Sequence, residues 1–483
     1  MSDSLKEKTI KGVVWSGLER FSTAGVNFII GLIIARILSP DEYGIIAMLA
    51  IFMAISQSII DSGFSNALIR KNDRKEIDFS TTLYKRQTLY FNVVISTLIY
   101  GILYLVSPFI ASFYGIQELE SIIKVVGTTL IWGALSIVQQ SILTINVDFK
   151  TQMMVSLFAA ILSGIIGIIM AMSGYGVWAL VGQMVTVSIF RTIALWLVAK
   201  WRPTTGFSKE SFKNLFGYGS KILMAGILET IYRNLYSIII GKYYQANALG
   251  LYHRGEQFAS YAASNITGVI QRVTFPVMSS LQDDAEMLNK AFIKTLRTTC
   301  FFVFPIMTYL FMVSEPLVKL ILTDKWIGCV PIIQILCISY MWYPVHILNL
   351  NILQVSGRSD LFFKIEVIKK IIGLAILFGS LPFGIIIMCW GRVLYCGLEL
   401  FINMYYTNHI VKTSCIQQLR HTIPFLLYCI VITIAAALFQ PYISSDILKL
   451  FINFIFIILV WLLVVQRIEN LYIRDFLLIL NRK

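Results

Sequence analysis

Polar and charged side chains recur at helical spacing inside an apolar stretch near the N-terminus, GVVWSGLERFSTAGVNFII at residues 12–30. Arg20, Thr23 and Asn27 follow Ser16 at intervals of four, three and four residues, so all four share one face of a helix. Glu19 precedes Arg20, but adjacent residues of a helix do not face each other. A charge at mid-bilayer costs roughly 2.5–3.5 kcal/mol on insertion scales. This face is therefore expected to meet water or protein rather than lipid.

Three further apolar segments carry a polar face of the same kind. In ILETIYRNLYSIII, Glu229 and Arg233 are four residues apart with the acid first, which is the favourable order for a helical ion pair. Gln57 and Asp61 share a face near the end of another segment. The most polar face, in LYHRGEQFASYAASNITGVIQRV, consists of Arg254, Gln257, Tyr261, Asn265, Gly268 and Arg272. We interpret the four faces as the walls of one hydrophilic cavity.

An arginine-bearing cavity favours an anionic ligand, because the guanidinium fork matches the geometry of phosphate oxygens. Tyr and Asn side chains on the same walls suit sugar hydroxyls. The predicted cavity-lining, substrate-binding residues are Arg20, Asn27, Arg233, Arg254, Gln257, Tyr261 and Arg272. The predicted ion-coupling acids are Glu19, Asp61, Glu229 and Glu256. The alternative for the same charges is a structural role, in which ion pairs lock the helices together.

The composition indicates a membrane protein, because 57% of the 483 residues are hydrophobic and 14% are charged, whereas soluble domains carry about 25% charged residues. A membrane span needs about 20 apolar residues. The first apolar segment lacks an A-x-A-like cleavage site and is interpreted as a retained span. The predicted fold is all-α and polytopic, with fourteen spans at residues 11–36, 43–66, 86–110, 121–146, 153–173, 176–199, 214–241, 249–275, 291–314, 328–354, 361–380, 382–408, 422–441 and 447–466.

The net charge of +14 is explained by membrane topology and not by nucleic acid. When the N-terminus is placed inside, the Lys and Arg residues of the short loops concentrate on the inner side, which predicts a cytoplasmic N-terminus and C-terminus. Seven cysteines without a C-x-x-C pair imply neither a disulfide framework nor a zinc site. The four histidines form no metal-binding spacing, and no phosphate-cradling G-x-x-x-x-G-K-[ST] motif is present. No cofactor or metal is expected.

An internal repeat predicts the domain organisation. The stretch IARILSPDEYG at 34–44 aligns without gaps on IGKYYQANALG at 240–250, and VSPF at 106–109 aligns with SEPL at 314–317, each pair being interpreted as the outer end of a span. Two six-helix units of the same orientation follow, as in transporters with parallel repeats. The predicted divisions are a six-helix bundle at 1–199, a cytoplasmic linker at 200–213, a second bundle at 214–410, and two extra spans with a tail at 411–483.

Four stretches resemble the bacterial polysaccharide flippases of the Wzx type, which translocate O-antigen, colanic-acid or capsule repeat units. They are WSGLERFSTAGVNFIIGLIIARILSPDEYGIIAML, IDSGFSNALIRK, YGVWALV at 175–181 and SNITGVIQRVTFPVMSSLQDD at 264–284. These flippases belong to the multidrug/oligosaccharidyl-lipid/polysaccharide exporter superfamily, and the resemblance covers roughly residues 5–410. It implies two bundles that open alternately to the two sides, a cationic lumen, and a pyrophosphate held by Arg20, Arg254 and Arg272, matched by helix and face.

The function implied by this resemblance is transport and not enzymatic catalysis. The substrate would be an undecaprenyl-pyrophosphate-linked oligosaccharide, moved from the inner to the outer leaflet of the bacterial inner membrane for surface polysaccharide biosynthesis. The expected partners are that lipid, H⁺ or Na⁺ as the coupling ion, membrane lipids and other polysaccharide assembly proteins. Two alternatives stay open. One is a multidrug/cation antiporter of the same superfamily, and the other is a membrane enzyme of polysaccharide assembly, such as a polymerase or glycosyltransferase.

Overall fold

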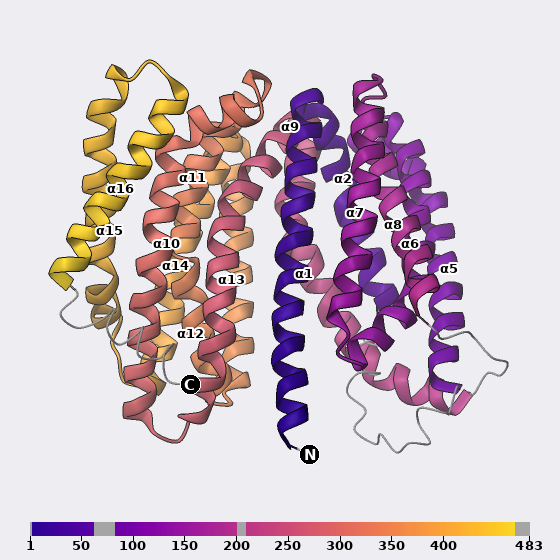
Figure 1. Cartoon of the computed structure of the whole chain (residues 1–483), viewed down its shortest axis with the longest axis horizontal. Coiled ribbons are helices and arrows are strands. Elements are labelled where there is room, and N and C mark those ends of the chain that lie inside the picture. Colours follow the sequence, from indigo (N-terminus) through magenta and orange to yellow (C-terminus); the bar gives the residue numbers. More distant parts are fainter. Residues whose placement is uncertain (1, 62–82, 200–208, 469–483) are drawn as a thin grey trace. The chain divides into compact units, whose positions relative to one another are not determined.

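The computed structural model describes residues 2–61, 83–199 and 209–468, and every regular element in these ranges is helical (Figure 1). Ten of the described segments are long and apolar enough to cross a membrane. Helices also occupy the remaining predicted spans, in α9 (Lys209–Ser280), α13 (Ser359–Ser380) and α16 (Asp446–Ile468). The prediction of an all-α polytopic membrane fold is confirmed.

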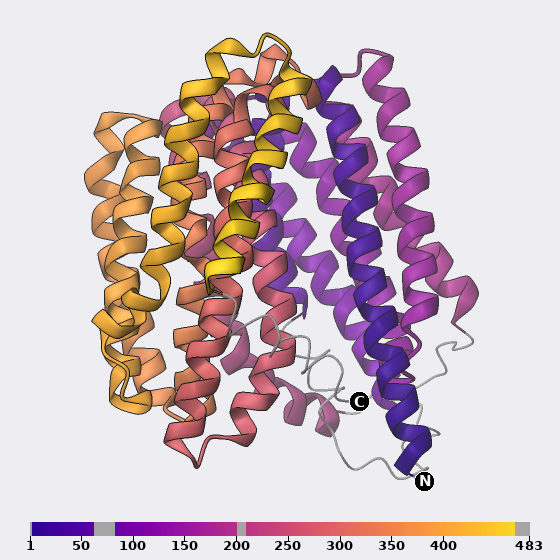
Figure 2. The same ribbon diagram turned by 60° about the vertical axis from the view of Figure 1, so that its left-hand side comes forward.

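In the N-terminal unit, Met1–Gly250, glycines allow neighbouring helices to pack closely. Its helices are α1 (Ser2–Ile37), α2 (Pro40–Asp61), α5 (Leu83–Tyr114), α6 (Glu118–Ile145), α7 (Phe149–Met172), α8 (Val177–Val198) and the part of α9 up to Gly250. α1 packs along α7, and α7 along α8 (Figure 2). A Cβ atom added to Gly164 of α7 would lie 2.2 Å from Cδ1 of Ile30 of α1. A glycine therefore lets α1 pack closely on α7, as small residues do in membrane helices.

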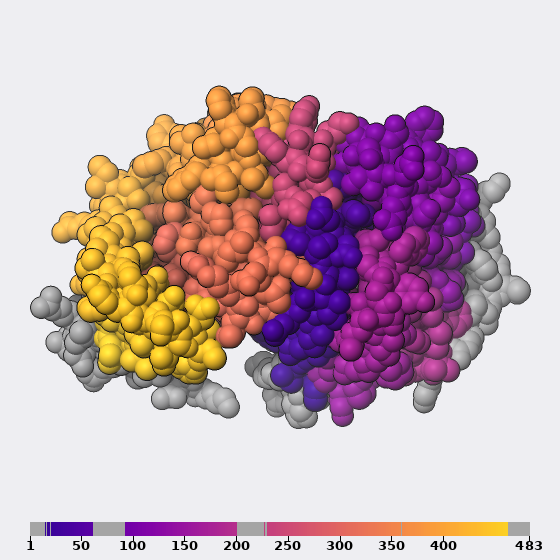
Figure 3. Space-filling model, turned by 90° about the horizontal axis from the view of Figure 1, so that it is seen from above, coloured from indigo at the N-terminus to yellow at the C-terminus, as the bar shows by residue number. Residues whose placement is uncertain are grey.

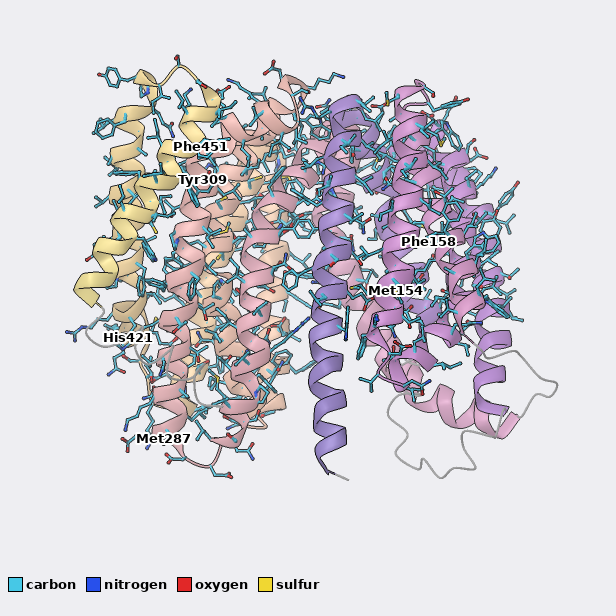
Figure 4. All side chains as sticks on the ribbon, in the orientation of Figure 1. Met154, Phe158, Met287, Tyr309, His421 and Phe451 are labelled. Carbon is cyan, nitrogen blue, oxygen red and sulfur yellow. The ribbon has the colours of Figure 1, made fainter. Side chains whose placement is uncertain are left out.

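The outer surface of this unit is apolar at helical spacing. On α7, Met154 and Phe158, which are labelled in Figure 4, are each about half exposed. Ile161, Ile165 and Ile169 continue the exposed stripe at intervals of three and four residues. A soluble protein rarely leaves such a stripe uncovered, whereas hydrocarbon requires it. α7 therefore has one face suited to lipid.

The C-terminal unit, Leu251–Lys483, packs its helices around α10 (Ala285–Ile321). The other helices are the part of α9 from Leu251 onward, η1 (Asp324–Cys329), α11 (Val330–Met341), α12 (Tyr343–Val355), α13, η2 (Leu381–Phe383), α14 (Ile385–Val411), α15 (Cys415–Phe439), η3 (Gln440–Tyr442) and α16. α15 and α16 both pack on α10 and form the edge of this unit, seen in yellow in Figure 3. The hydroxyl of Tyr309 on α10 donates to the carbonyl of Leu450, 3.3 Å away, which ties α16 in place.

The repeated proline motifs do not end their helices, and that part of the sequence prediction is wrong. α5 continues past Pro108 to Tyr114, and α10 continues past Pro316 to Ile321. A proline inside a helix leaves the carbonyl four residues earlier without its N–H partner. Here the Ser107 hydroxyl donates to the Tyr104 carbonyl at 2.7 Å. The Gln440 amide donates to the Met312 carbonyl at 3.1 Å. Because side chains replace both lost donors, the helices continue.

Two predicted spans have different boundaries in the structure. α9 contains both spans 214–241 and 249–275 without an intervening loop, and its only break is at Gln245, with φ 67° and ψ 179°. We call residues 209–244 and 246–280 the first and second arms of α9. The span predicted at 328–354 is divided between α11 and α12 at Trp342. The division comes just before Pro344, which lacks the N–H that a continuous helix would use.

Candidate functional site

Two helix corners touch through their backbones within the N-terminal unit. One is the α1–α2 corner at Ser39, and the other is the break in α9 at Gln245. A Cβ atom added to Gly44 would lie 1.8 Å from the carbonyl oxygen of Ala246, and one added to Gly250 would lie 1.9 Å from that of Pro40. No side chain larger than hydrogen fits at either position. We call this contact the corner crossing.

The corner crossing is reciprocal. Asn247 Nδ2 donates to Asp41 Oδ2 at 2.7 Å, and these two residues are 206 apart in the sequence. The same interval separates Gly44 from Gly250 and Pro40 from Ala246, and it is the interval of the aligned repeat. Such a pattern is what a local two-fold relation between the two corners produces. Further along the same helices, the hydroxyls of Ser58 on α2 and Thr230 on α9 are 3.1 Å apart.

The first arm of α9 carries an exposed ion pair. Arg233 Nε lies 3.9 Å from Glu229 Oε1, and the two side chains are 77% and 51% exposed. The predicted helical pairing of these residues therefore occurs. With a rise of 1.5 Å per residue, Arg233 lies about 18 Å along α9 from the break at Gln245. If that break lies at the surface of a hydrocarbon layer about 30 Å thick, Arg233 lies near the middle of the layer.

The second arm of α9 changes from buried to exposed along its predicted polar face. Arg254 is 4% exposed, donates to Gln257 Oε1 at 2.7 Å, and lies over the Trp326 ring with its Cζ atom 5.3 Å from the ring centroid. Tyr261 is 41% exposed. Arg272, near the far end, is exposed and makes no ion pair or hydrogen bond to another described residue. In this conformation Arg272 is accessible to a ligand and Arg254 is not.

Glu256 belongs to a polar cluster that the sequence analysis did not select. It forms an ion pair with Arg392 of α14, whose Nη1 lies 2.5 Å from Glu256 Oε1. The hydroxyl of Tyr340 donates to the same oxygen at 3.1 Å, and Arg392 also donates to the hydroxyls of Tyr340 and Tyr252. A detectable signal was the lone arginine inside the apolar run IIIMCWGRVLYCG. Because Glu256 is already neutralised by an arginine, it is a weaker coupling candidate than its sequence suggested.

Glu19 points into the N-terminal unit. It accepts a hydrogen bond from Ser156 of α7 at 3.4 Å and is attracted by Arg191 of α8. Arg191 in turn donates to Gln140 Oε1 of α6 at 3.0 Å. These contacts join α1, α6, α7 and α8, which fits the structural alternative for Glu19.

Three further predicted residues lie on α1 and α2. Asn27 is exposed on α1. Arg20 lies in α1 and Asp61 is the last residue of α2, but their side chains lie outside the described part of the structure. Their proposed roles stay predictions.

The described residues offer binding groups more readily than reactive ones. No group of three or more His, Cys, Asp or Glu side chains in the described ranges is arranged to hold a metal ion. All seven cysteines are free, and six of them are buried. Burial in apolar surroundings makes a thiol inert. The arginines, amides and tyrosines of α9 suit reversible binding of a polar anion.

Comparison with known proteins decides the family. The family model described as "Polysaccharide biosynthesis protein" matches residues 33–331, which is more than half of the chain. The chain belongs to this family. It is 23% identical to the teichuronic acid biosynthesis protein TuaB of Bacillus subtilis (strain 168), over 88% of this chain and 87% of that protein. It is 24% identical to the lipopolysaccharide biosynthesis protein WzxC of Escherichia coli (strain K12), over 90% of this chain and 88% of that protein.

The fold of this family member is that of a known lipid flippase. The solved structure of the lipid II flippase MurJ, in an inward closed conformation, superposes with a TM-score of 0.74. The superposition covers 93% of this chain and 97% of that chain at 14% sequence identity, so it establishes the fold alone. The resemblance to polysaccharide flippases is therefore confirmed at the level of family and fold. The prediction of a carrier rather than an enzyme agrees with both comparisons.

Proposed function

We propose that this family member translocates lipid-linked oligosaccharide repeat units from the inner to the outer leaflet of a bacterial inner membrane. The lipid carrier is undecaprenyl pyrophosphate, and the units serve surface polysaccharide synthesis. The proposal is supported by relatives named for teichuronic acid and lipopolysaccharide biosynthesis, which match nearly the whole chain. Both termini are proposed to be cytoplasmic. Two six-helix bundles, at 1–199 and 214–410, would carry out the movement.

The structural observation that carries the proposal is the exposure of arginines on α9. With the break at Gln245 placed at the outer surface, Arg233 would lie near mid-depth, and its side chain is 77% exposed although its Nε lies 3.9 Å from Glu229 Oε1. Placing such a charge in hydrocarbon would cost roughly 2.5–3.5 kcal/mol, so we place this face of α9 against water. Arg272 adds an exposed guanidinium on the second arm. A wet surface with cations suits the pyrophosphate and acidic sugars, while the polyprenyl tail stays in lipid.

The corner crossing is proposed to close the outer end of the path. With the N-terminus inside, the α1–α2 corner lies on the outer side of the membrane. In an alternating-access cycle the crossing separates when the substrate leaves for the outer leaflet. The glycines at 44 and 250 suit this cycle for two reasons. The two backbones pack closely enough to exclude water, and they can separate without moving a side chain out of the way.

The direct test measures where lipid-linked repeat units accumulate in a strain that lacks this gene. The probe is a lectin or glycosidase that reaches only the outer leaflet. The proposal predicts units trapped on the inner face and released when the gene is restored. Units that reach the outer face but remain unpolymerised would point to an enzyme of assembly. Normal polysaccharide with a new sensitivity to cationic drugs would point to an antiporter.

A matched pair of arginine variants then tests the site. Arg272→Ala removes an exposed cation of α9, while Arg420→Ala removes an exposed arginine from α15, in the appended hairpin. We expect Arg272→Ala to lower surface polysaccharide at unchanged protein level, and Arg420→Ala to leave it unchanged. Equal polysaccharide in both variants would remove Arg272 from the binding surface.

A further inference from the structure

The break in α9 places a residue with a side chain in a backbone conformation that suits glycine. Gln245 has φ 67° and ψ 179°, a region essentially restricted to glycine because a Cβ atom crowds the neighbouring peptide groups there. The Gln245 side chain is exposed and makes no hydrogen bond to another described residue. No hydrogen bond of its own side chain therefore offsets the strain of this backbone.

The second corner of the crossing forms without such a backbone. Ser39 at the α1–α2 corner is the repeat equivalent of Gln245, since the two residues are 206 apart in the sequence. The described non-glycine residues with a positive φ are Val147, Gln245, Thr323 and Lys412, so Ser39 is not among them. Because one of the two related corners does without a positive φ, the strain at Gln245 is a separate feature of α9.

Packing holds the chain on both sides of Gln245. Before the break, Gly241 packs closely on α5, because a Cβ atom added to it would lie 3.1 Å from Cε1 of Tyr114. After the break, the Asn247 amide donates to Asp41 in the corner crossing. A strained conformation persists only where its surroundings hold it in place. The closed corner crossing is thus part of what keeps Gln245 strained.

The bend also brings the two arms of α9 into contact beside Gln245. Leu249 of the second arm is fully buried, and its Cδ2 would lie 3.2 Å from a Cβ atom added to Gly241 of the first arm. In a continuous helix these two residues would be about 12 Å apart along the axis. The burial of Leu249 against Gly241 therefore depends on the bend and disappears when α9 straightens.

We propose that Gln245 is a strained hinge that favours opening of the corner crossing. The closed crossing holds the Gln245 backbone in its strained conformation. When the two corners separate, φ returns to the negative region that a residue with a Cβ atom prefers. The strain raises the free energy of the closed state alone and so increases the open population. The inference rests on the proposed function for its role in transport, in which the crossing closes the outer end of the path.

Two substitutions at the hinge separate the backbone from the side chain. Gln245→Gly removes the Cβ atom and its crowding, whereas Gln245→Ala removes the same amide group but keeps the Cβ atom. The reporter of opening is Leu249→Cys in the full chain in lipid nanodiscs. Its background is Cys415→Ser, because the other native cysteines are buried. A water-soluble methanethiosulfonate reagent labels the new thiol when the bend opens.

We expect Gln245→Gly to slow labelling about 5- to 150-fold, which corresponds to roughly 1–3 kcal/mol of relieved strain in the closed state. Gln245→Ala should label at the rate of the parent. Equal rates in the two variants, or faster labelling of Gln245→Gly, would overturn the proposal, because the closed backbone would then carry no strain. A parent thiol that does not react would also overturn it, since the bend would not open.

Surface polysaccharide provides the transport arm. Gln245→Gly should lower it at unchanged protein level, because the outer end opens less often, and Gln245→Ala should leave it unchanged. If Gln245→Gly slows labelling but the deletion strain traps no lipid-linked units, the proposed function fails and the hinge stands. If units are trapped but Gln245→Gly does not slow labelling, the hinge fails and the proposed function stands.

Discussion

The corner crossing supports a sharp prediction for Gly250→Ala. The added methyl group would lie 1.9 Å from the Pro40 carbonyl oxygen and 3.1 Å from the Gly44 backbone nitrogen. Ordinary contact begins at 3.4 Å, so the two backbones must separate by about 1.5 Å. The obstacle is main chain, which cannot rotate out of the way as a side chain does. The closed crossing should therefore lose stability relative to an open one.

The size of the effect follows from the cost of overpacking. An extra methyl in a close-packed contact costs typically 1–3 kcal/mol. If the crossing exists in only one of two conformations, the whole cost falls on that conformation. The equilibrium then shifts about 5- to 150-fold toward the open state. Gly44→Ala should act similarly, since its methyl group would lie 1.8 Å from the Ala246 carbonyl oxygen. The double variant should add little once the crossing is open.

Disulfide cross-linking measures this equilibrium. Cysteines at positions 41 and 247 replace side chains whose polar atoms are 2.7 Å apart, in a Cys415→Ser background because the other native cysteines are buried. An oxidant then traps the closed crossing, and the rate of cross-linking reports its population. Gly250→Ala should slow cross-linking and reduce surface polysaccharide.

Gly25→Ala is the matched control, because a Cβ atom there meets nothing within 4 Å. It should cross-link at the parent rate. An unchanged rate in Gly250→Ala, at equal expression, would refute the reasoning that the crossing is tight and mobile. The same reduction in both variants would show a general effect of alanine instead.

Three further predictions concern single side chains. Arg392→Met leaves the partly buried carboxylate of Glu256 without its ion-pair partner. Because both side chains are about a quarter exposed, thermal unfolding in detergent should show a loss below the about 3–5 kcal/mol that breaking a fully buried pair costs, and the double variant with Glu256→Met should recover part of it. Replacing Arg272 by Lys keeps the charge but loses the fork, so surface polysaccharide should fall less than with alanine. The guanidinium of Arg358, the residue just before α13, donates to Asp360 in the first turn of that helix and lowers the pKa of the Asp360 carboxyl to about 2. Since a lowered pKa keeps the carboxyl ionised at every pH above that value, Asp360→Asn should leave the transport profile between pH 5 and 8 unchanged.

Local patterns in the sequence were sufficient to predict where the helices lie and which residues contact each other within one helix. Apolar run length predicted every described span, because backbone groups in lipid must bond within their own segment. The Glu229–Arg233 pair was predictable for the same reason, since residues four apart on a helix are neighbours whatever surrounds them. The missing loop at Gln245 was not predictable, because QAN contains no glycine or proline to mark how the chain bends there.

Packing between distant helices decided the rest. Arg254 and Arg272 lie on one helical face, yet Trp326 buries the first and nothing described covers the second. The sequence predicted Glu256 as an ion-coupling acid, but in the structure Arg392, 136 residues away, donates to its carboxylate and neutralises its charge. Helical periodicity determines which residues share a face, but the neighbour on that face comes from another part of the chain. For this reason the sequence by itself determined a membrane carrier with charged helices, and only the tertiary structure decided which charges are paired and which are open to a ligand.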